Sequence, residues 1–490
     1  MTCLLGSGLL SRADSLREKF KQGGDSRYID EAISLGREAL DLCPHGHPRR
    51  FDCLLDLAYH LRNRYNRLGG VEGLNEGILR GREALELCPP GHADRSMCLN
   101  NLASNLWTRY KLLGGGEDLN DAILFSRETL GLRPPGHPDR SMSLNNLANY
   151  LGDRYDLLGG VEDLSEAILL ARESVRLRPP GHSGRSHSLK TLAMCLGTRY
   201  NLLGGVEDLN EAILLDRETV MLRPPGHPGR SRSLSNLANR LASRYELLGK
   251  VEDLNEAILF DRETLKLNPP GHPGRPMSLN NLANDLSDRY ELLGGVEDLN
   301  EAILLARESV GLRPPGHSGR SHSLKTLAMC LGTRYNLLGG VEDLNEAILL
   351  DRETVILRPP GHPGRSRSLG SLAVRLADRY NLLGKVEDLN EAVQLDRDAL
   401  ALHPQGHPDR SKSLNNLAIR LGTRYELLGG VEDLNEAILL DREALTLCPP
   451  GHPTRSGSLK NFAAHLNTRY KLVGRSLLKS SQYLTDCFPI

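Results

Sequence analysis

The sequence is poor in aromatic residues and carries almost no net charge. Phe, Trp and Tyr make up 4% of the 490 residues, and Trp107 is the single tryptophan. Few rings are therefore available for stacking on nucleic-acid bases. Lys and Arg number 61 against 62 Asp and Glu, so no net field attracts nucleic acid or an anionic membrane. We therefore expect neither a nucleic-acid nor a membrane partner.

The nine cysteines include no Cys-x-x-Cys pair, and their number is odd. This pattern favours reduced thiols in a cytoplasmic protein over a disulfide framework. The apolar stretch from Met1 to Leu10 has no basic segment before it and is too short to span a bilayer. A secretory signal is therefore not predicted, and the expected location is the cytoplasm.

A fixed period of 45 residues runs through the chain. Tyrosines keep this step from Tyr65 to Tyr470, and Gly-His pairs keep it as well. A period of this size is the signature of a solenoid, in which each repeat packs on its neighbours. The ten histidines of the Gly-His pairs are His47, His92, His137, His182, His227, His272, His317, His362, His407 and His452.

Residues 138–182, taken as one repeat, have the pattern of two helices. The first half places apolar residues at helical spacing, and Gly159 and Gly160 follow as a helix end. The second half opens with Asp163 and Glu166, which match a capping box. The two expected helices are about 19 and 14 residues long. Their expected buried faces are Leu144, Leu147, Ala148, Leu151, Tyr155 and Leu158 in the first, and Leu164, Ala167, Ile168, Ala171 and Val175 in the second.

The motifs of this repeat resemble those of the tetratricopeptide repeat. Residues 144–148, Leu-Asn-Asn-Leu-Ala, are similar to the opening of that repeat, and Ala167 fits the alanine of its second helix. Residues 83–85, Glu-Ala-Leu, followed by Pro89, resemble its end. The standard repeat has roughly 34 residues, and the excess here lies in a longer first helix and its connections. Within the superfamily the chain resembles long fungal arrays that often precede a caspase-like CHAT peptidase domain, and it is also similar to kinesin light chain repeats.

This resemblance and the period together predict an all-α fold, a right-handed α-solenoid of about ten helix-turn-helix repeats. We expect residues 1–26 to form a degenerate N-terminal capping helix and residues 27–473 to form the solenoid. The pattern breaks after Leu472, so residues 474–490 are expected to be a divergent tail. Two alternatives remain open for the tail: an improvised cap from Leu477 to Phe488, or a disordered end left by truncation of a longer protein, which we favour.

The histidine column does not predict a metal site. Helices pack about 8–10 Å apart, so equivalent histidines of successive two-helix repeats should lie on the order of 20 Å apart, whereas ligand bonds are about 2 Å. Each histidine is instead expected to bond backbone in its turn or to cap the next helix. Cys195 and Cys330 lie on expected first helices without a singular histidine partner, so no protease dyad is predicted. We predict no catalytic residue, no cofactor and no small-molecule substrate.

Polar positions on the first helices are the candidate partner-binding residues. In tetratricopeptide arrays the first helices line the concave groove, and an amide both donates and accepts hydrogen bonds, so it can pair with a peptide backbone. The alternative is that these amides bond to neighbouring helices or water. The asparagines in question are Asn100, Asn101, Asn145, Asn146, Asn280, Asn281, Asn415 and Asn416.

Positions that vary between repeats are suited to specificity. Asn149, Met194 and Met329 belong to one such column, and Trp107 belongs to another. For Trp107, filling the core is as good an interpretation as anchoring a partner. These features favour a protein–protein interaction scaffold that binds a protein or peptide in its groove. The alternatives are the sensor or substrate-docking arm of a CHAT peptidase, and a nucleic-acid-binding solenoid whose affinity would fall steeply with salt.

Overall fold

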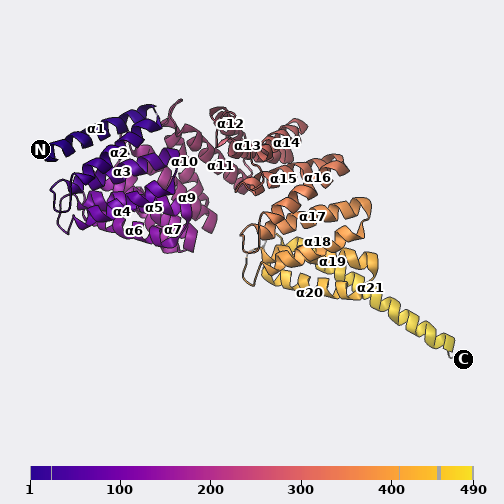
Figure 1. The fold of residues 1–490 in the computed structure, drawn as a ribbon. Helices are drawn as coiled ribbons and strands as arrows, with labels where there is room; N and C mark the ends of the chain where they lie inside the picture. The colour runs from indigo at the N-terminus through magenta and orange to yellow at the C-terminus, as the bar shows by residue number, and fades with distance from the viewer. Residues whose placement is uncertain (1, 24, 408, 450–453, 488–490) are drawn as a thin grey trace. The chain divides into compact units, whose positions relative to one another are not determined.

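The computed structural model describes residues 2–23, 25–407, 409–449 and 454–487, and in this part of the chain every regular element is an α-helix (Figure 1). The first helices are α1 (Thr2–Gly23), α3 (Arg50–Leu68), α5 (Arg95–Leu113), α7 (Arg140–Leu158), α9 (Arg185–Leu203), α11 (Arg230–Leu248), α13 (Arg275–Leu293), α15 (Arg320–Leu338), α17 (Arg365–Leu383), α19 (Arg410–Leu428) and α21 (Arg455–Cys487). The second helices are α2 (Ser26–Asp41), α4 (Val71–Glu86), α6 (Gly116–Gly131), α8 (Val161–Arg176), α10 (Val206–Met221), α12 (Val251–Leu267), α14 (Val296–Gly311), α16 (Val341–Ile356), α18 (Val386–Ala401) and α20 (Val431–Leu447). The predicted all-α array of about ten helix pairs is confirmed.

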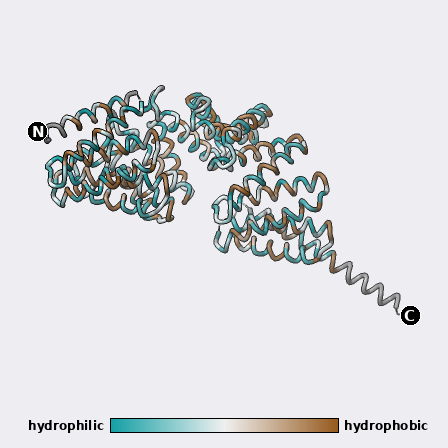
Figure 2. The backbone as a smooth tube through the Cα atoms, in the orientation of Figure 1, coloured by the Kyte–Doolittle hydropathy of each residue, from teal (hydrophilic) through white to brown (hydrophobic). Residues whose placement is uncertain are grey.

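The helices form two compact halves, Met1–Leu247 and Leu248–Ile490. Within each half, successive helices pack side by side as antiparallel pairs (Figure 1). Both apolar and polar residues are distributed over the helices coloured in Figure 2. In the N-terminal half one apolar cluster runs from Leu74 on α4 to Ala212 on α10. The core is therefore continuous across repeats, as expected of a solenoid.

The first helix of the repeat at residues 138–182 has the predicted length, with 19 residues in α7. Leu144, Leu147, Ala148 and Leu151 are all buried, at 1% exposure or less. The prediction that Leu158 belongs to this face is wrong, since its side chain is 68% exposed. Leu158 is the last residue of α7, beside the turn, where no packed helix covers it.

The second helix begins earlier than predicted. Helix α8 has 16 residues and starts at Val161, and its N-cap, Gly160, makes no side-chain capping bond. The capping-box prediction is therefore wrong. Asp163 instead accepts two hydrogen bonds from Arg154, at 2.6 Å from both Nε and Nη2. A bidentate bond to a guanidinium is stronger than one bond to a backbone N–H, which explains the preference.

The same Arg–Asp pair joins the two helices in most repeats. Both partners are largely buried, with side-chain exposures of 24% for Arg154 and 15% for Asp163. These pairs therefore fix the angle between the helices of a repeat more firmly than exposed ion pairs could. The equivalent pairs are Arg109–Asp118, Arg199–Asp208, Arg289–Asp298, Arg334–Asp343, Arg379–Asp388 and Arg424–Asp433.

The turns match the sequence analysis. Gly159 has φ 75° and ψ 14°, the left-handed conformation that favours glycine at a helix end. In the Gly-His turn, Nδ1 of His182 accepts the backbone N–H of Gly184 at 3.0 Å. The prediction that these histidines bond backbone is confirmed for the nine that the structure describes, whereas His452 lies outside the described residues. The other eight are His47, His92, His137, His227, His272, His317, His362 and His407.

The two ends of the array are helical. Helix α1 buries Leu10, Ala13, Leu16 and Phe20 in a cluster that includes Ile29 of α2. Helix α21 has 33 residues and continues through Cys487, the last described residue. The assignments of residues 1–26 to a cap and of residues 474–490 to a divergent tail stay predictions.

Candidate partner-binding face

The eight predicted asparagines lie on four first helices: α5, α7, α13 and α19. In two pairs, on α13 and α19, the first member donates to the next repeat. Asn280, which is fully buried, donates its amide to Ser323 Oγ at 3.4 Å, and Asn415 donates to Ser458 Oγ at 2.8 Å. The carbonyl oxygens of Asn145, Asn280 and Asn415 are buried and accept no hydrogen bond from described residues. The amides of Asn280 and Asn415 therefore contact neighbouring helices, as one of the two interpretations expects.

The second member of each pair is partly accessible. Asn101, Asn146, Asn281 and Asn416 are all half-buried. Asn146 donates its amide to Oδ1 of Asn100 at 3.2 Å, which links α5 and α7. Asn101 and Asn416 line cavities between first helices.

The variable positions differ among themselves. Met194 is 37% exposed, whereas Met329 is half-buried. Asn149 donates to Thr191 Oγ1 of the next first helix at 3.1 Å. Asn149, Met194 and Met329 are at equivalent positions of the array but differ in side chain or exposure. The surface at this position therefore varies from repeat to repeat.

Trp107 packs partly against the core of the N-terminal half. Its indole N–H donates to Asp153 Oδ2 at 2.5 Å, and its ring lies 5.4 Å from that of Tyr150. Asp153, which accepts the hydrogen bond, and Tyr150, which contacts the ring, are both on α7, the next first helix. The ring therefore joins two repeats, and its edge remains half-buried at the surface.

Three cavities open between first helices at equivalent positions, and we call the surface that holds them the first-helix face. It comprises the positions equivalent to Met142, Asn145, Asn146 and Asn149. The cavity lined by α3, α5 and the start of α7 has a volume of about 490 Å³ and includes Asn100 and Asn101. One between α9 and α11 has about 410 Å³ and includes Met194, and one among α17, α18 and α19 has about 230 Å³ and includes Asn416.

The cavity between α9 and α11 is basic. Lys190 and Arg232 line it, and Arg240 lies beside them with its Nε 2.6 Å from Oδ2 of the buried Asp216. Because Arg240 neutralises Asp216, the charges of Lys190 and Arg232 face the cavity. Burial, followed by the charges of Arg232 and Arg223, lowers the pKa of Lys190. An anion in this cavity would relieve that repulsion.

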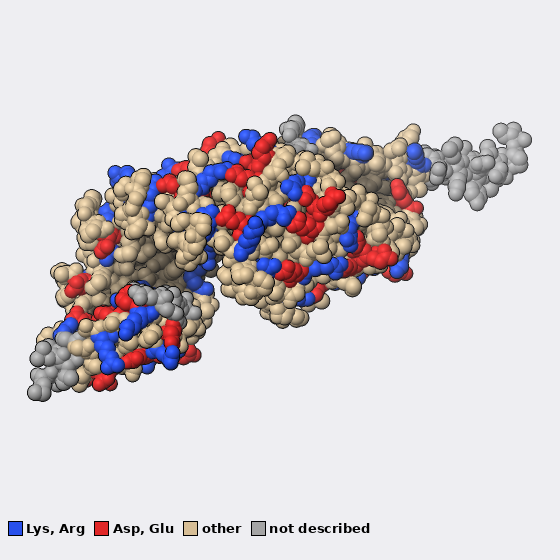
Figure 3. Space-filling model, turned by 90° about the horizontal axis from the view of Figure 1, so that it is seen from above, with Lys and Arg blue, Asp and Glu red and all other residues tan. Residues whose placement is uncertain are grey.

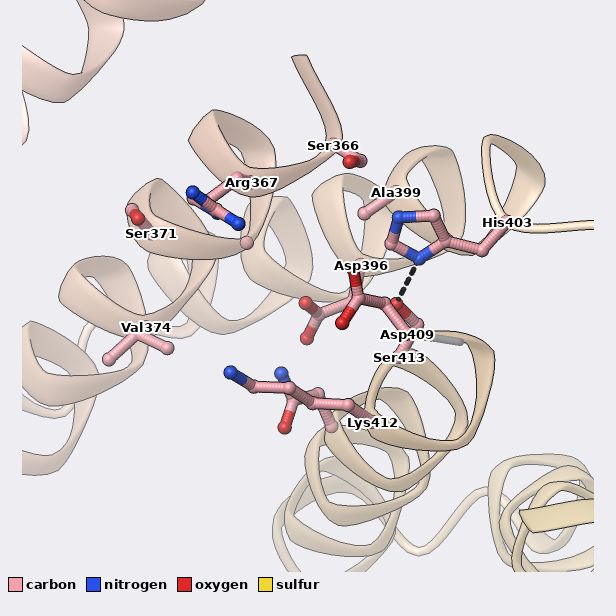
Figure 4. A pocket seen from close by; sticks show the side chains of 12 residues that line it. Ser366, Arg367, Ser371, Val374, Asp396, Ala399, His403, Asp409, Lys412 and Ser413 are labelled. Carbon is pink, nitrogen blue, oxygen red and sulfur yellow. Dashed lines mark hydrogen bonds between the residues drawn. The ribbon is translucent and has the colours of Figure 1, made fainter. Parts of the chain in front are cut away.

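The cavity among α17, α18 and α19 repeats the arrangement in the C-terminal half. Arg367 of α17 and Lys412 of α19 extend toward it from different helices, and Asp396 of α18 lies between them (Figure 4). Burial raises the pKa of Asp396 to about 6, and Arg420 partly offsets this shift. The Nε of Arg420 lies 3.7 Å from Oδ2 of Asp396. Here too one arginine partners the buried aspartate and two further cations face the cavity.

The cavity of the first repeats has a different charge. Asp56, Asp94 and Asp139 line it together with Arg133. Burial, together with the charges of Asp14 and Asp52, raises the pKa of Asp56 to about 6. The first-helix face is therefore acidic at its start and basic further along each half, whereas charges of both signs are interspersed over the surface drawn in Figure 3.

Our sequence analysis did not single out these cations. The signal that could have found Arg232, Arg367 and Lys412 is the third position of the first helices, which is methionine, histidine or a basic residue from α5 to α19. That position is occupied by Met97, Met142, His187, Arg232, Met277, His322, Arg367 and Lys412. Lys190 lies instead at the sixth position of α9.

No protein-family model and no curated protein sequence matches the chain. Its structure is similar to that of a monomeric mutant of human IFIT1 with Gppp-AAAA, with a TM-score of 0.51 and 14% identity over 90% of this chain and 87% of that one. It is also similar to a signal transduction ATPase with a tetratricopeptide repeat sensor from Pyrococcus horikoshii, with a TM-score of 0.50 and 13% identity over 94% of this chain and 73% of that one. The fold is a tetratricopeptide-like helical array. A Podospora anserina kinesin light chain with nearly identical TPR-like repeats has 23% identity and a TM-score of 0.34, over 44% of this chain and 98% of that one.

Two cysteines on first helices of this tetratricopeptide-like array are poor nucleophiles. Cys195 and Cys330 are buried, and burial raises the pKa of each to about 12. A thiol must ionise to attack, so neither is a reactive group at neutral pH. In the part of the array that the structure describes, no helix is long and apolar enough to cross a membrane.

Proposed function

We propose that this chain is a non-enzymatic scaffold that binds an extended, acidic segment of a partner protein on its first-helix face. The observation that carries the proposal is that two cations line a cavity in each half of the array, and that one of them, Arg232 or Lys412, has the same repeat position in both halves. They are Lys190 and Arg232 in the N-terminal half, and Arg367 and Lys412 in the C-terminal half.

These cations are available to a partner. Arg232, Arg367 and Lys412 are exposed and Lys190 is half-buried. None of the four has an ion-pair partner among the side chains that the structure describes. The buried carboxylates beside them, Asp216 and Asp396, are each matched by an arginine of their own, and the exposed Asp409 also lines the C-terminal cavity. A segment with carboxylates at suitable spacing would therefore find unpaired cations on two parts of the array.

The shape of the cavities supports a peptide over a folded domain. Volumes of about 230 to 490 Å³ suit a few side chains each. Half-buried amides lie beside two of them, at Asn101 and Asn416, and can pair with an extended backbone. Backbone pairing would give affinity and the cations would select acidic side chains.

The experiment is fluorescence anisotropy of a labelled glutamate-rich peptide titrated with the full chain. The same peptide with glutamine in place of glutamate is the matched probe. Arg232→Met and Lys412→Met change each cation to the residue present at the equivalent Met142 and Met277. Each should weaken binding by about two- to fivefold, since an exposed charge pair contributes up to about 1 kcal/mol.

Arg172→Ala is the control variant, because Arg172 lies on the second helix α8 and pairs with Glu211 at 2.6 Å. It should leave affinity unchanged. Equal binding of the glutamine peptide, or no effect of either methionine variant, would refute the proposal. Tighter binding of single-stranded RNA than of the acidic peptide, with a steep salt dependence, would assign the face to nucleic acid instead.

A further inference from the structure

The turn between α18 and α19 is chemically unlike the other turns of the array. It contains a second histidine, His403, four residues before the turn histidine His407. Asp409 follows two residues later. Among the residues that the structure describes, these three form a group whose possible ligand atoms all lie within 4.8 Å of one another.

The environment of His403 suits a metal ligand. Its side chain is 7% exposed, and its ring stacks on that of His407 with centroids 4.2 Å apart. Its Nδ1 lies 2.8 Å from Ser413 Oγ (Figure 4). When Nδ1–H donates to that hydroxyl, the lone pair is on Nε2, which is the usual arrangement of a metal-binding histidine and its orienting partner.

We propose that His403, His407 and Asp409 bind one divalent transition-metal cation, with Zn²⁺ as the best match. Two imidazoles and a carboxylate are ligands that zinc accepts, and a fourth position would stay open. His403 and Asp409 both line the cavity among α17, α18 and α19, so the open position would face it. The proposal is independent of the acidic-partner proposal, since it concerns the turn and not Arg367 or Lys412.

The three ligands need only a small rearrangement. Ligand atoms at about 2 Å from a tetrahedral zinc lie ~3.3 Å apart, so the group must close by an ångström or so from its present spacing. His407 is half-buried and Asp409 is exposed, so both can rotate. His407 Nδ1 accepts the Asp409 backbone N–H at 3.1 Å, and a cation on that atom would replace this bond.

The other repeats provide substitutions that keep the fold. The position of His403 holds arginine in five repeats, and Arg358 bonds to Ser368 Oγ at 2.8 Å just as His403 bonds to Ser413. A guanidinium cannot ligate a cation. The position of Asp409 holds glycine at Gly364. His403→Arg and Asp409→Gly should therefore remove ligands without disturbing the turn.

The test is isothermal titration of the full chain with Zn²⁺. We expect one bound ion per chain, lost in His403→Arg and in Asp409→Gly. Ser413→Ala removes the group that orients His403 and should weaken binding by roughly tenfold. His362→Ala, in the preceding repeat, changes a turn histidine without a second histidine beside it and should leave zinc affinity unchanged. Absence of zinc binding, or binding that survives both ligand substitutions, would overturn the proposal.

Titration with Co²⁺ identifies the competing site. Cys88 Sγ lies 3.6 Å from Cys98 Sγ and 3.5 Å from His92 Nδ1, so this buried group could also take a soft cation. Thiolate binding gives a sulfur-to-cobalt absorption band, whereas imidazole and carboxylate ligands do not. A strong sulfur band that persists in His403→Arg would place the metal at the cysteines and overturn the assignment.

Discussion

Asp261 on α12 should destabilise the array at neutral pH, and replacing it should stabilise the protein. Its side chain is fully buried, and neither carboxylate oxygen has a hydrogen-bond partner among the described residues. Burial raises its pKa to about 8. A buried carboxyl group without a partner stays protonated, because ionisation in such a place is costly.

The equivalent positions explain why Asp261 lacks a partner. In four other repeats the aspartate at this position is followed 24 residues later by a basic residue, as in Asp216–Arg240, Asp351–Arg375, Asp396–Arg420 and Asp441–His465. The residue 24 positions after Asp261 is Asp285, so an acid stands where the others have a base. In this repeat the buried aspartate therefore faces a second acidic residue instead of a basic one.

The free energy by which buried Asp261 destabilises the folded chain follows from its pKa. The carboxyl titrates at 3.8 when exposed and at about 8 when folded. Between these values the unfolded chain is ionised and the folded chain is protonated, so stability is lost as the pH rises from about 4 to about 8. One pKa unit corresponds to about 1.4 kcal/mol, so the cost at pH 7 is about 4 kcal/mol. Below pH 4 the cost vanishes.

The perturbation is Asp261→Ala, which introduces the residue present at the equivalent Ala171 and Ala306. Urea unfolding followed by far-UV circular dichroism, at pH 4.5 and pH 7, measures the shift. We expect a higher midpoint for the variant at pH 7, worth about 3–4 kcal/mol after loss of some packing contacts, and little difference at pH 4.5.

Asp441→Ala is the matched control, because Asp441 accepts a 2.6 Å bond from Nδ1 of His465. Its removal should lower the midpoint rather than raise it, since it leaves His465 without its partner. If Asp261→Ala left the midpoint unchanged at pH 7, or shifted it equally at both pH values, the reasoning from burial would be refuted.

Three further predictions concern other contacts. Asp343→Ala should lower stability by about 1–2 kcal/mol in urea titrations, because Arg334 loses two bonds of 2.6 Å, and an unchanged midpoint would contradict this. Asn280→Ala should cost about 1 kcal/mol, because its amide donates to Ser323, and should leave affinity for the acidic peptide unchanged. A loss of affinity without loss of stability would instead make Asn280 a partner-binding residue. Cys330 should resist alkylation until the chain unfolds, as measured by mass spectrometry with and without urea, since burial raises its pKa to about 12.

The helical array could be predicted almost entirely from the sequence, because its determinants are local. Leu144, Leu147 and Leu151 mark one face of a helix, and Gly159 marks its end. The capping-box prediction failed because it considered only the residues next to the helix start and not a side chain from the other helix of the repeat. Asp163 has the position of a capping residue, but a guanidinium nine residues earlier binds it more strongly.

The candidate site was less predictable, because its contacts join residues from different repeats. Sequence analysis selected positions such as Asn101 and Met194, and these do line cavities. It could not show that Asn280 faces a serine 43 residues later. That spacing follows from how successive first helices pack, which the period alone does not determine.

Comparison of the repeats shows which buried positions depend on each other. Where the first-helix position holds arginine, as at Arg240 and Arg420, the second-helix position 24 residues earlier holds aspartate. Where it holds Cys195 or Cys330, that earlier position is alanine. Each buried position is thus constrained by a partner in the preceding repeat, and a single change there leaves an unpaired charge.

The third position of the first helices has no such partner, which bears on how the array can choose what it binds. It changes from Met142 to Arg232, to Met277 and to Lys412, while the buried leucines of the same helices stay the same. Since the two basic side chains are exposed, replacing either costs little folding free energy. The charge of the first-helix face can therefore vary from repeat to repeat without loss of the fold, whereas its buried Asp–Arg pairs cannot. Selectivity for a partner should accordingly follow the third position, so exchanging methionine and arginine there should transfer peptide preference between repeats.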